Sequence, residues 1–101
     1  MQLQWKCERD YFEQADKRDG LPVEHSRVGM GQYERTDTPA QQRAAMPYSY
    51  RTRDDDGAIC RAGRCSSRDD EWAFAPLDVD GPDLGATTIE YKQDDGTWEV
   101  L

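Results

Sequence analysis

Two cysteines separated by four residues, Cys60 and Cys65, are the first candidates for chemistry in this 101-residue chain. Thiolates bind zinc, and structural zinc sites most often use two closely spaced pairs of ligands. The remaining cysteine and the single histidine, Cys7 and His25, lie far away in the sequence. This spacing is not specific for zinc, so we expect no metal and no cofactor. A structural domain stabilised by a Cys3His zinc site built from these four residues remains the alternative.

The cysteine pair could also form a disulfide or supply a reactive thiol. A disulfide needs an oxidising compartment, whereas three cysteines and the absence of a recognisable signal peptide favour free thiols in the cytoplasm. No histidine lies nearby in the sequence as a base for a catalytic thiol. We therefore predict no catalytic residue, with Cys7 and Cys60 buried and Cys65 near the surface. Three arginines surround the pair, and we expect them to bind the protein's own acids: Arg61, Arg64 and Arg68.

The carboxylates suggest calcium binding, but their spacing is wrong for it. An EF-hand loop starting at Asp78 would place Pro82 and Ile89 where oxygen ligands are needed. Because Asp and Gly are typical of turns, 54–57 and 80–83 are better interpreted as turns. Pairs of acids are also too common in this chain to identify a hydrolase, so we predict a protein that is not an enzyme.

Negative charge is concentrated in the last third of the chain. Residues 69–101 carry ten acids and one base and have a net charge of −9, whereas residues 1–68 have a net charge of +1. Such a segment is either a solvated face that keeps the protein soluble or a binding surface for a basic partner. We predict the second and name these acids as partner-binding residues: Asp69, Asp70, Glu71, Asp78, Asp80, Asp83, Glu90, Asp94, Asp95 and Glu99.

Period-two alternation of apolar and polar residues predicts most of the elements. A helix is expected over 8–20, and a second begins at Thr38 with a capping box to Gln41 and ends before Pro47. Residues 21–37 remain ambiguous between a loop and an irregular strand. The expected strands are 2–7, 48–53, 58–61, 71–79, 87–92 and 97–101, with turns at 54–57, 80–83 and 94–96.

These elements predict an α+β fold, a small antiparallel sheet of about four to six strands with one or two short helices. We expect one domain over 1–101 with an acidic β-hairpin region at 69–101. Only 13 residues are Leu, Ile, Val or Phe, so three Trp and five Tyr should form an aromatic core. No segment has the length of apolar sequence that a membrane span needs.

The function that these features favour is docking on a basic surface of a partner, of the kind found in nucleic-acid-handling complexes. The protein itself should not bind nucleic acid, because its carboxylates repel phosphates. Small size, acidity and the lack of catalytic motifs are typical of phage-encoded inhibitors such as anti-CRISPR proteins or DNA mimics, an analogy of physical type rather than a family resemblance. A subunit of a larger, virion-like assembly is the remaining alternative.

Overall fold

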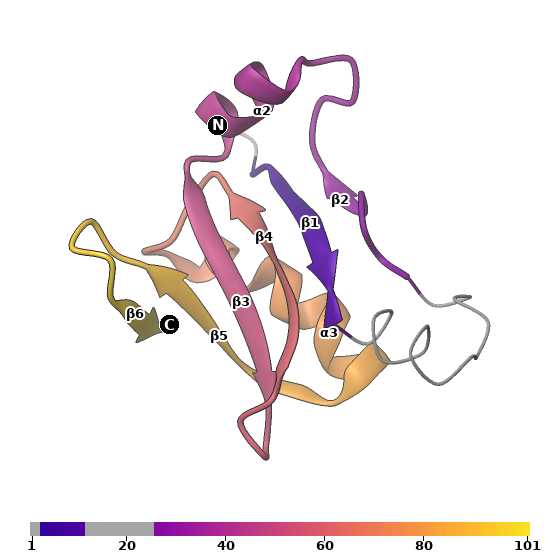
Figure 1. The fold of residues 1–101 in the computed structure, drawn as a ribbon, viewed down its shortest axis with the longest axis vertical. Coiled ribbons are helices and arrows are strands. Elements are labelled where there is room, and N and C mark those ends of the chain that lie inside the picture. Colours follow the sequence, from indigo (N-terminus) through magenta and orange to yellow (C-terminus); the bar gives the residue numbers. More distant parts are fainter. Residues whose placement is uncertain (1–2, 12–25) are drawn as a thin grey trace.

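The fold is a six-stranded antiparallel sheet with a short 3-10 helix and an α-helix packed on one side, as the computed structural model shows for residues 3–11 and 26–101 (Figure 1). The strand order is β2-β1-β4-β3-β5-β6. This arrangement confirms the predicted α+β class. The elements are β1 (Trp5–Asp10), β2 (Gly31–Gln32), α2 (Pro39–Ala45), β3 (Tyr48–Asp54), β4 (Ile59–Cys65), η1 (Glu71–Phe74), α3 (Ala75–Leu84), β5 (Ala86–Lys92) and β6 (Trp98–Val100).

The two hairpins form where turn residues separate alternating segments. Between β3 and β4, the carboxylate of Asp54 accepts hydrogen bonds from the backbone N–H groups of Asp56 and Ala58. Gly57 follows with a φ of 81°, a left-handed conformation that glycine adopts without steric cost. Between β5 and β6, the carboxylate of Asp95 accepts from Thr97 in the same way. Both hairpins were predicted from these residues and are confirmed.

Helix α2 begins as its capping box predicts. The backbone N–H of Gln41 donates to the Thr38 hydroxyl, and the backbone N–H of Thr38 donates to the Gln41 side chain. Pro39 occupies the first turn, where its missing N–H has no intrahelical partner to lose. The helix ends at Ala45, before Pro47, so the second predicted helix is confirmed.

Residues 71–84 were predicted wrongly, because this segment is helical and not a strand followed by a turn. Asp70 caps η1 by accepting a hydrogen bond from the backbone N–H of Trp72. Pro76 lies in the first turn of α3, and Gly85 closes the helix in the left-handed conformation, with a φ of 72°. Pro82 lies inside the helix, and the residue before it is a glycine, whose lack of a Cβ removes the usual clash with a following proline. The acidic region 69–101 is therefore a hairpin only from β5 onward.

The helix predicted over 8–20 is wrong at its start, where residues 8–10 continue β1. A register shift between Cys7 and Arg9 lets Glu8 project outward while Cys7 and Asp10 both remain buried. The remainder of this predicted helix, from Phe12 on, lies outside the described residues.

The core is aromatic, as the composition predicted. Trp5 and Tyr50 pack edge to face with ring centroids 6.5 Å apart, and Tyr91 lies 6.2 Å beyond Tyr50. The Tyr91 hydroxyl donates a 2.7 Å hydrogen bond to the carbonyl of Ala73, which attaches η1 to β5. Partly buried aliphatic side chains of α3 pack against the same core.

All three cysteines are free and buried, so the prediction that Cys65 lies near the surface is wrong. Strand β4 does not end at Arg61 but continues to Cys65, which pairs with Trp5 on one side and Tyr48 on the other. Burial, together with the negative charge of nearby Asp80, raises the pKa of the Cys7 thiol to about 12. The prediction of unreactive thiols at Cys7 and Cys60 agrees with this burial.

Candidate functional site

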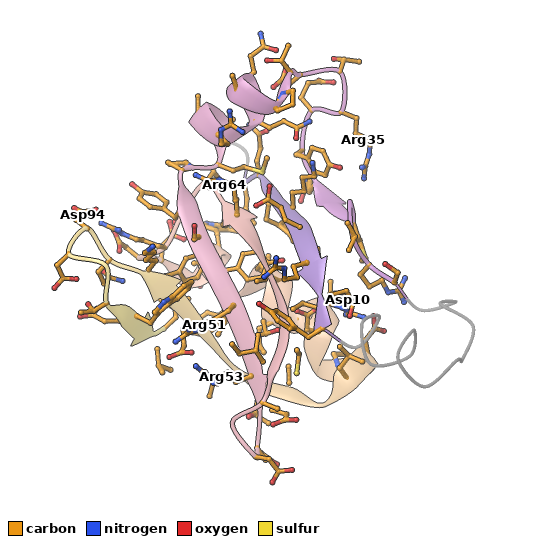
Figure 2. The ribbon with its side chains drawn as sticks, viewed as in Figure 1. Asp10, Arg35, Arg51, Arg53, Arg64 and Asp94 are labelled. Carbon is orange, nitrogen blue, oxygen red and sulfur yellow. The ribbon has the colours of Figure 1, made fainter. Side chains whose placement is uncertain are left out.

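The two sides of the sheet differ in charge. Helix α3 packs against one side, while α2 lies at one end of the sheet (Figure 1). Residues directly opposite each other on neighbouring strands share a side, and the register aligns Arg9, Ala62, Arg51 and Glu90 across four strands. The side away from α3 therefore carries a group of cations, three of them labelled in Figure 2: Lys6, Arg9, Arg51, Arg53 and Arg64.

Most of these cations are bound by the protein's own acceptors. Arg51 and Arg53 both donate to one carboxylate oxygen of Glu90. Arg64 donates 2.9 Å and 3.4 Å hydrogen bonds to two backbone carbonyls after α2, and Lys6 donates to the side chain of Gln42. Of the three arginines predicted to bind the protein's own acids, Arg61 and Arg68 do so, whereas Arg64 binds backbone carbonyls instead. This side of the sheet is consequently a self-paired basic surface.

Glu90, one of the ten predicted partner-binding acids, is thus occupied by two arginines. Burial disfavours its charged form, but the hydrogen bonds and charges of Arg53 and Arg51 outweigh that effect, so the pKa of Glu90 lies below its ordinary value of 4.5. Its carboxylate stabilises the sheet and has little capacity left for a partner.

Replacing Glu90 by glutamine should destabilise the protein in a pH-dependent manner. Because the pKa of Glu90 is lowered by folding, its contribution is fully present above pH 4.5 and is lost as the pH falls through the folded-state pKa. The difference in free energy of unfolding between wild type and Glu90→Gln, measured by urea denaturation at a series of pH values, should close on acidification. Glu99→Gln, at an exposed site on β6, is the control and should show no such gap. A difference in free energy of unfolding between wild type and Glu90→Gln that persists at acid pH would contradict a stabilising role for the Glu90 carboxylate.

Two further predicted acids, Asp80 and Asp83, surround Arg61 beneath α3. The Arg61 side chain is 1% exposed, and its guanidinium lies 2.8 Å from Asp80, 3.1 Å from Asp10 and 3.2 Å from Asp83. Burial raises the pKa of Asp80 despite hydrogen bonds from Arg61 and Thr52. Burial also opposes ionisation of Asp83, but Arg27 and Arg61 outweigh it and hold the pKa of that carboxyl below its usual value. Asp80 therefore belongs to the core, and Asp83 to its edge.

The seven other predicted acids are exposed and fall into two groups. One group lies on the β5–β6 hairpin, where Asp94 binds Arg68 at 3.2 Å and Asp95 is engaged by Thr97, which lowers its pKa. Glu99 follows on β6. The other group lies on η1 and α3 and the turn before them: Asp69, Asp70, Glu71 and Asp78.

The η1–α3 group borders a groove of about 610 Å³, which we call the Trp72 groove. Its lining includes the carboxylates of Asp70, Glu71 and Asp78, the indole of Trp72 and the apolar side chain of Leu3. Trp72 is 62% exposed, an unusual value for so large an apolar side chain. No lysine or arginine of the described chain lines the groove. Among residues 3–11 and 26–101, no cation pairs with Glu71 or Asp78.

The structure brings three predicted site residues together here and adds two that the sequence interpretation missed. A strand over 71–79 would have put Trp72 and Phe74 on one buried face, whereas the helical segment leaves Trp72 in solvent. Asp70 as a cap, Pro76 near the helix start and Gly85 at its end are local signals that favour a helix, although Gly81 and Pro82 oppose it. Leu3 reaches the groove from the residues that precede β1, a contact without a local sequence signal.

The zinc alternative receives no support from the described part of the chain. Cys7, Cys60 and Cys65 do not form a group that could hold a metal ion, and His25 lies outside the described residues. The described helices include none that is long and apolar enough to cross a membrane.

Comparison with known proteins gives no match to a protein-family model, to a curated protein or to a solved structure.

Proposed function

We propose that this protein is a non-enzymatic binding protein that docks on a basic surface of a partner through the Trp72 groove. One observation carries the proposal. Three acidic residues line the same groove as the exposed Trp72, and the lining contains no lysine or arginine from the described residues. A partner that supplies positive charge completes this surface, because each carboxylate then gains the counter-ion that the described chain does not provide.

The contrast with the other acids supports this choice of surface. Glu90, Asp80 and Asp83 are engaged by arginines within the protein, and Asp94 is engaged by Arg68. Glu71 and Asp78 have no such partner in the described chain, so the electrostatic potential of the groove is not cancelled locally. Of the predicted partner-binding acids, the proposal therefore places Asp70, Glu71 and Asp78 at the centre of the contact and Asp69 at its rim.

The basic surfaces of largest charge density are those that bind nucleic acid, so we propose a nucleic-acid-handling complex as the partner. Docking there would occupy the site of the nucleic acid and inhibit the complex, as anti-CRISPR proteins and DNA mimics do. The protein would act without binding nucleic acid itself, in the cytoplasm. Three free thiols support a reducing compartment, and the net charge of −8 supports a protein that is attracted to cations.

Charge reversal tests the proposal against a matched control. Affinity-tagged wild type, Glu71→Lys/Asp78→Lys and Asp55→Lys/Asp56→Lys are used to capture partners from nuclease-treated host lysate. The control changes the same number of charges on exposed residues of the 54–57 turn, at the opposite end of β4 from the groove. We expect the groove variant to lose affinity about tenfold or more, and the control to change about twofold or less.

The salt dependence of the captured complex gives the second readout. Binding through charge complementarity weakens steeply as ionic strength rises, because exposed charges are screened. Capture that is undiminished by high salt, or an equal loss of affinity in both variants, would contradict docking through the groove.

A further inference from the structure

Trp72 differs from the other tyrosine and tryptophan side chains of the described chain. The buried aromatic rings pack against one another in the core. The partly exposed rings are covered by the protein's own cations at 4.1 to 5.8 Å from the ring centroid: Arg51 on Trp98, Arg35 on Tyr33, Arg68 on Tyr48 and Arg9 on Tyr11. Trp72 is the most exposed of these side chains, and no described cation lies over its ring.

The groove around this bare indole has the chemistry of an arginine receptor. An indole is the best of the aromatic rings at attracting a cation to its face. A guanidinium is planar and weakly hydrated, so its face stacks on an aromatic ring while its N–H groups donate to carboxylates in the same plane. Asp70, Glu71 and Asp78 line the groove beside the indole, and only Asp70 is already occupied, by the backbone N–H of Trp72.

We propose that the Trp72 groove binds the side chain of an arginine presented by the partner. The guanidinium stacks on Trp72 and donates to Glu71 and Asp78, and its aliphatic stem lies against Leu3 and Ala75. Lysine is a poorer ligand, because its compact ammonium cannot stack and holds its water more strongly. The inference rests on the proposed function, which supplies the basic partner, and names the residue type that the partner inserts.

A blocked tri-arginine peptide tests the site directly, with blocked tri-lysine as a probe of the same charge. Titration is followed by NMR through the indole N–H signals of the three tryptophans and the backbone amide signals of the groove residues, which also report binding to Trp72→Leu. That variant identifies the indole signal of Trp72. We expect tri-arginine to shift the Trp72 signal saturably while the Trp98 signal stays in place. Tri-arginine should bind Trp72→Leu about three- to tenfold more weakly than it binds the wild type, the factor that a cation–π contact supplies. Tri-lysine should bind the wild type more weakly than tri-arginine by the same factor. Trp98→Phe should bind tri-arginine as wild type does, because Arg51 already covers that ring.

Equal binding of the two peptides, or undiminished binding of tri-arginine to Trp72→Leu, would overturn the inference. Trp72 is 62% exposed, so its replacement should leave the thermal melt unchanged, and a matching melt excludes misfolding as the cause of lost binding. Different results would overturn the arginine site and the proposed function. A partner captured equally by wild type and Trp72→Leu, but less by Glu71→Lys/Asp78→Lys, overturns only the arginine site. Saturable arginine binding without any salt-dependent partner supports the site and overturns the proposed function.

Discussion

The Arg61→Met variant should unfold at a much lower urea concentration than the wild type. Arg61 is buried, and its removal leaves the carboxylates of Asp10 and Asp80 in the core without this cation. Removing one partner of a buried ion pair costs about 3–5 kcal/mol. This is a large share of the roughly 5–15 kcal/mol that stabilises a small domain. Urea denaturation followed by tryptophan fluorescence measures the loss.

Two variants separate the loss of charge from the loss of packing. Arg64→Met removes an arginine from the same strand that donates to two backbone carbonyls and to no carboxylate, and it should cost about 1 kcal/mol or less. Adding Asp80→Asn to Arg61→Met should restore part of the stability, because it removes one uncompensated charge. Acidification should also reduce the difference from wild type, since burial already raises the pKa of Asp80 and its neutral form needs no counter-ion. Equal stability of Arg61→Met and Arg64→Met would contradict a role for the buried network.

The Gly63→Ala variant should lose about 3 kcal/mol or more, because β4 has no room for a side chain at this position. A Cβ atom added there would lie 1.9 Å from the carbonyl oxygen of Lys6 and 2.9 Å from the Tyr50 ring. The first contact is with the backbone of β1, so relief requires that the β1–β4 pairing move. The shift would spread to the Trp5–Tyr50 contact at the centre of the core. Thermal melts of the purified variants measure the effect.

Gly57→Ala is the matched control, since it makes the same chemical change where space is open. A Cβ at Gly57 meets no atom within 4 Å, but its φ of 81° is left-handed and costs an alanine about 1–2 kcal/mol. The smaller loss at Gly57 would therefore measure backbone strain alone. A Gly63→Ala variant that is no less stable than Gly57→Ala would show that β1 and β4 do not approach so closely.

The sheet was predictable wherever local signals and tertiary environment agree. Residues 48–53 alternate and are followed by a strong turn signal, and Thr38 and Gln41 form a capping box that is complete within four residues. The structure follows these patterns because each is satisfied by contacts close in sequence. The end of β4 at Cys65 was missed, since glycine and arginine interrupt the apolar pattern there and only pairing with β1 and β3 continues the strand.

Helix α3 shows the opposite case, a segment whose local signals conflict. Gly81 and Pro82 are typical of a turn, yet both lie within the helix. Its stability comes from packing against β5, from the Tyr91–Ala73 hydrogen bond beside it and from the Asp80–Arg61 ion pair. Such contacts are made across the fold and cannot be read from a window of ten residues.

The candidate site was predictable only in part for the same reason. Counting charges along the chain selected Asp70, Glu71 and Asp78, which the structure leaves exposed; their role in binding stays a prediction. It also included Asp80 and Glu90, whose arginine partners lie 19 and 39 residues earlier in the sequence. Pairing at that separation depends on strand order, which the sequence pattern does not specify. The exposure of Trp72 was not predicted, because the segment was interpreted as a strand and not as a helix.

The cluster around Arg61 also imposes an order on folding during synthesis. Asp10 is made 51 residues before Arg61, and Asp80 follows Arg61 by a further 19. The first strand therefore cannot reach its final position until β4 has been translated, and Arg61 does not gain its second buried carboxylate, Asp80, until α3 has left the ribosome. Contacts between segments so distant in sequence form slowly. The nascent chain consequently exposes β1, with its tryptophan and cysteine, for most of its synthesis, and this strand is where chaperones and proteases would meet the unfinished protein.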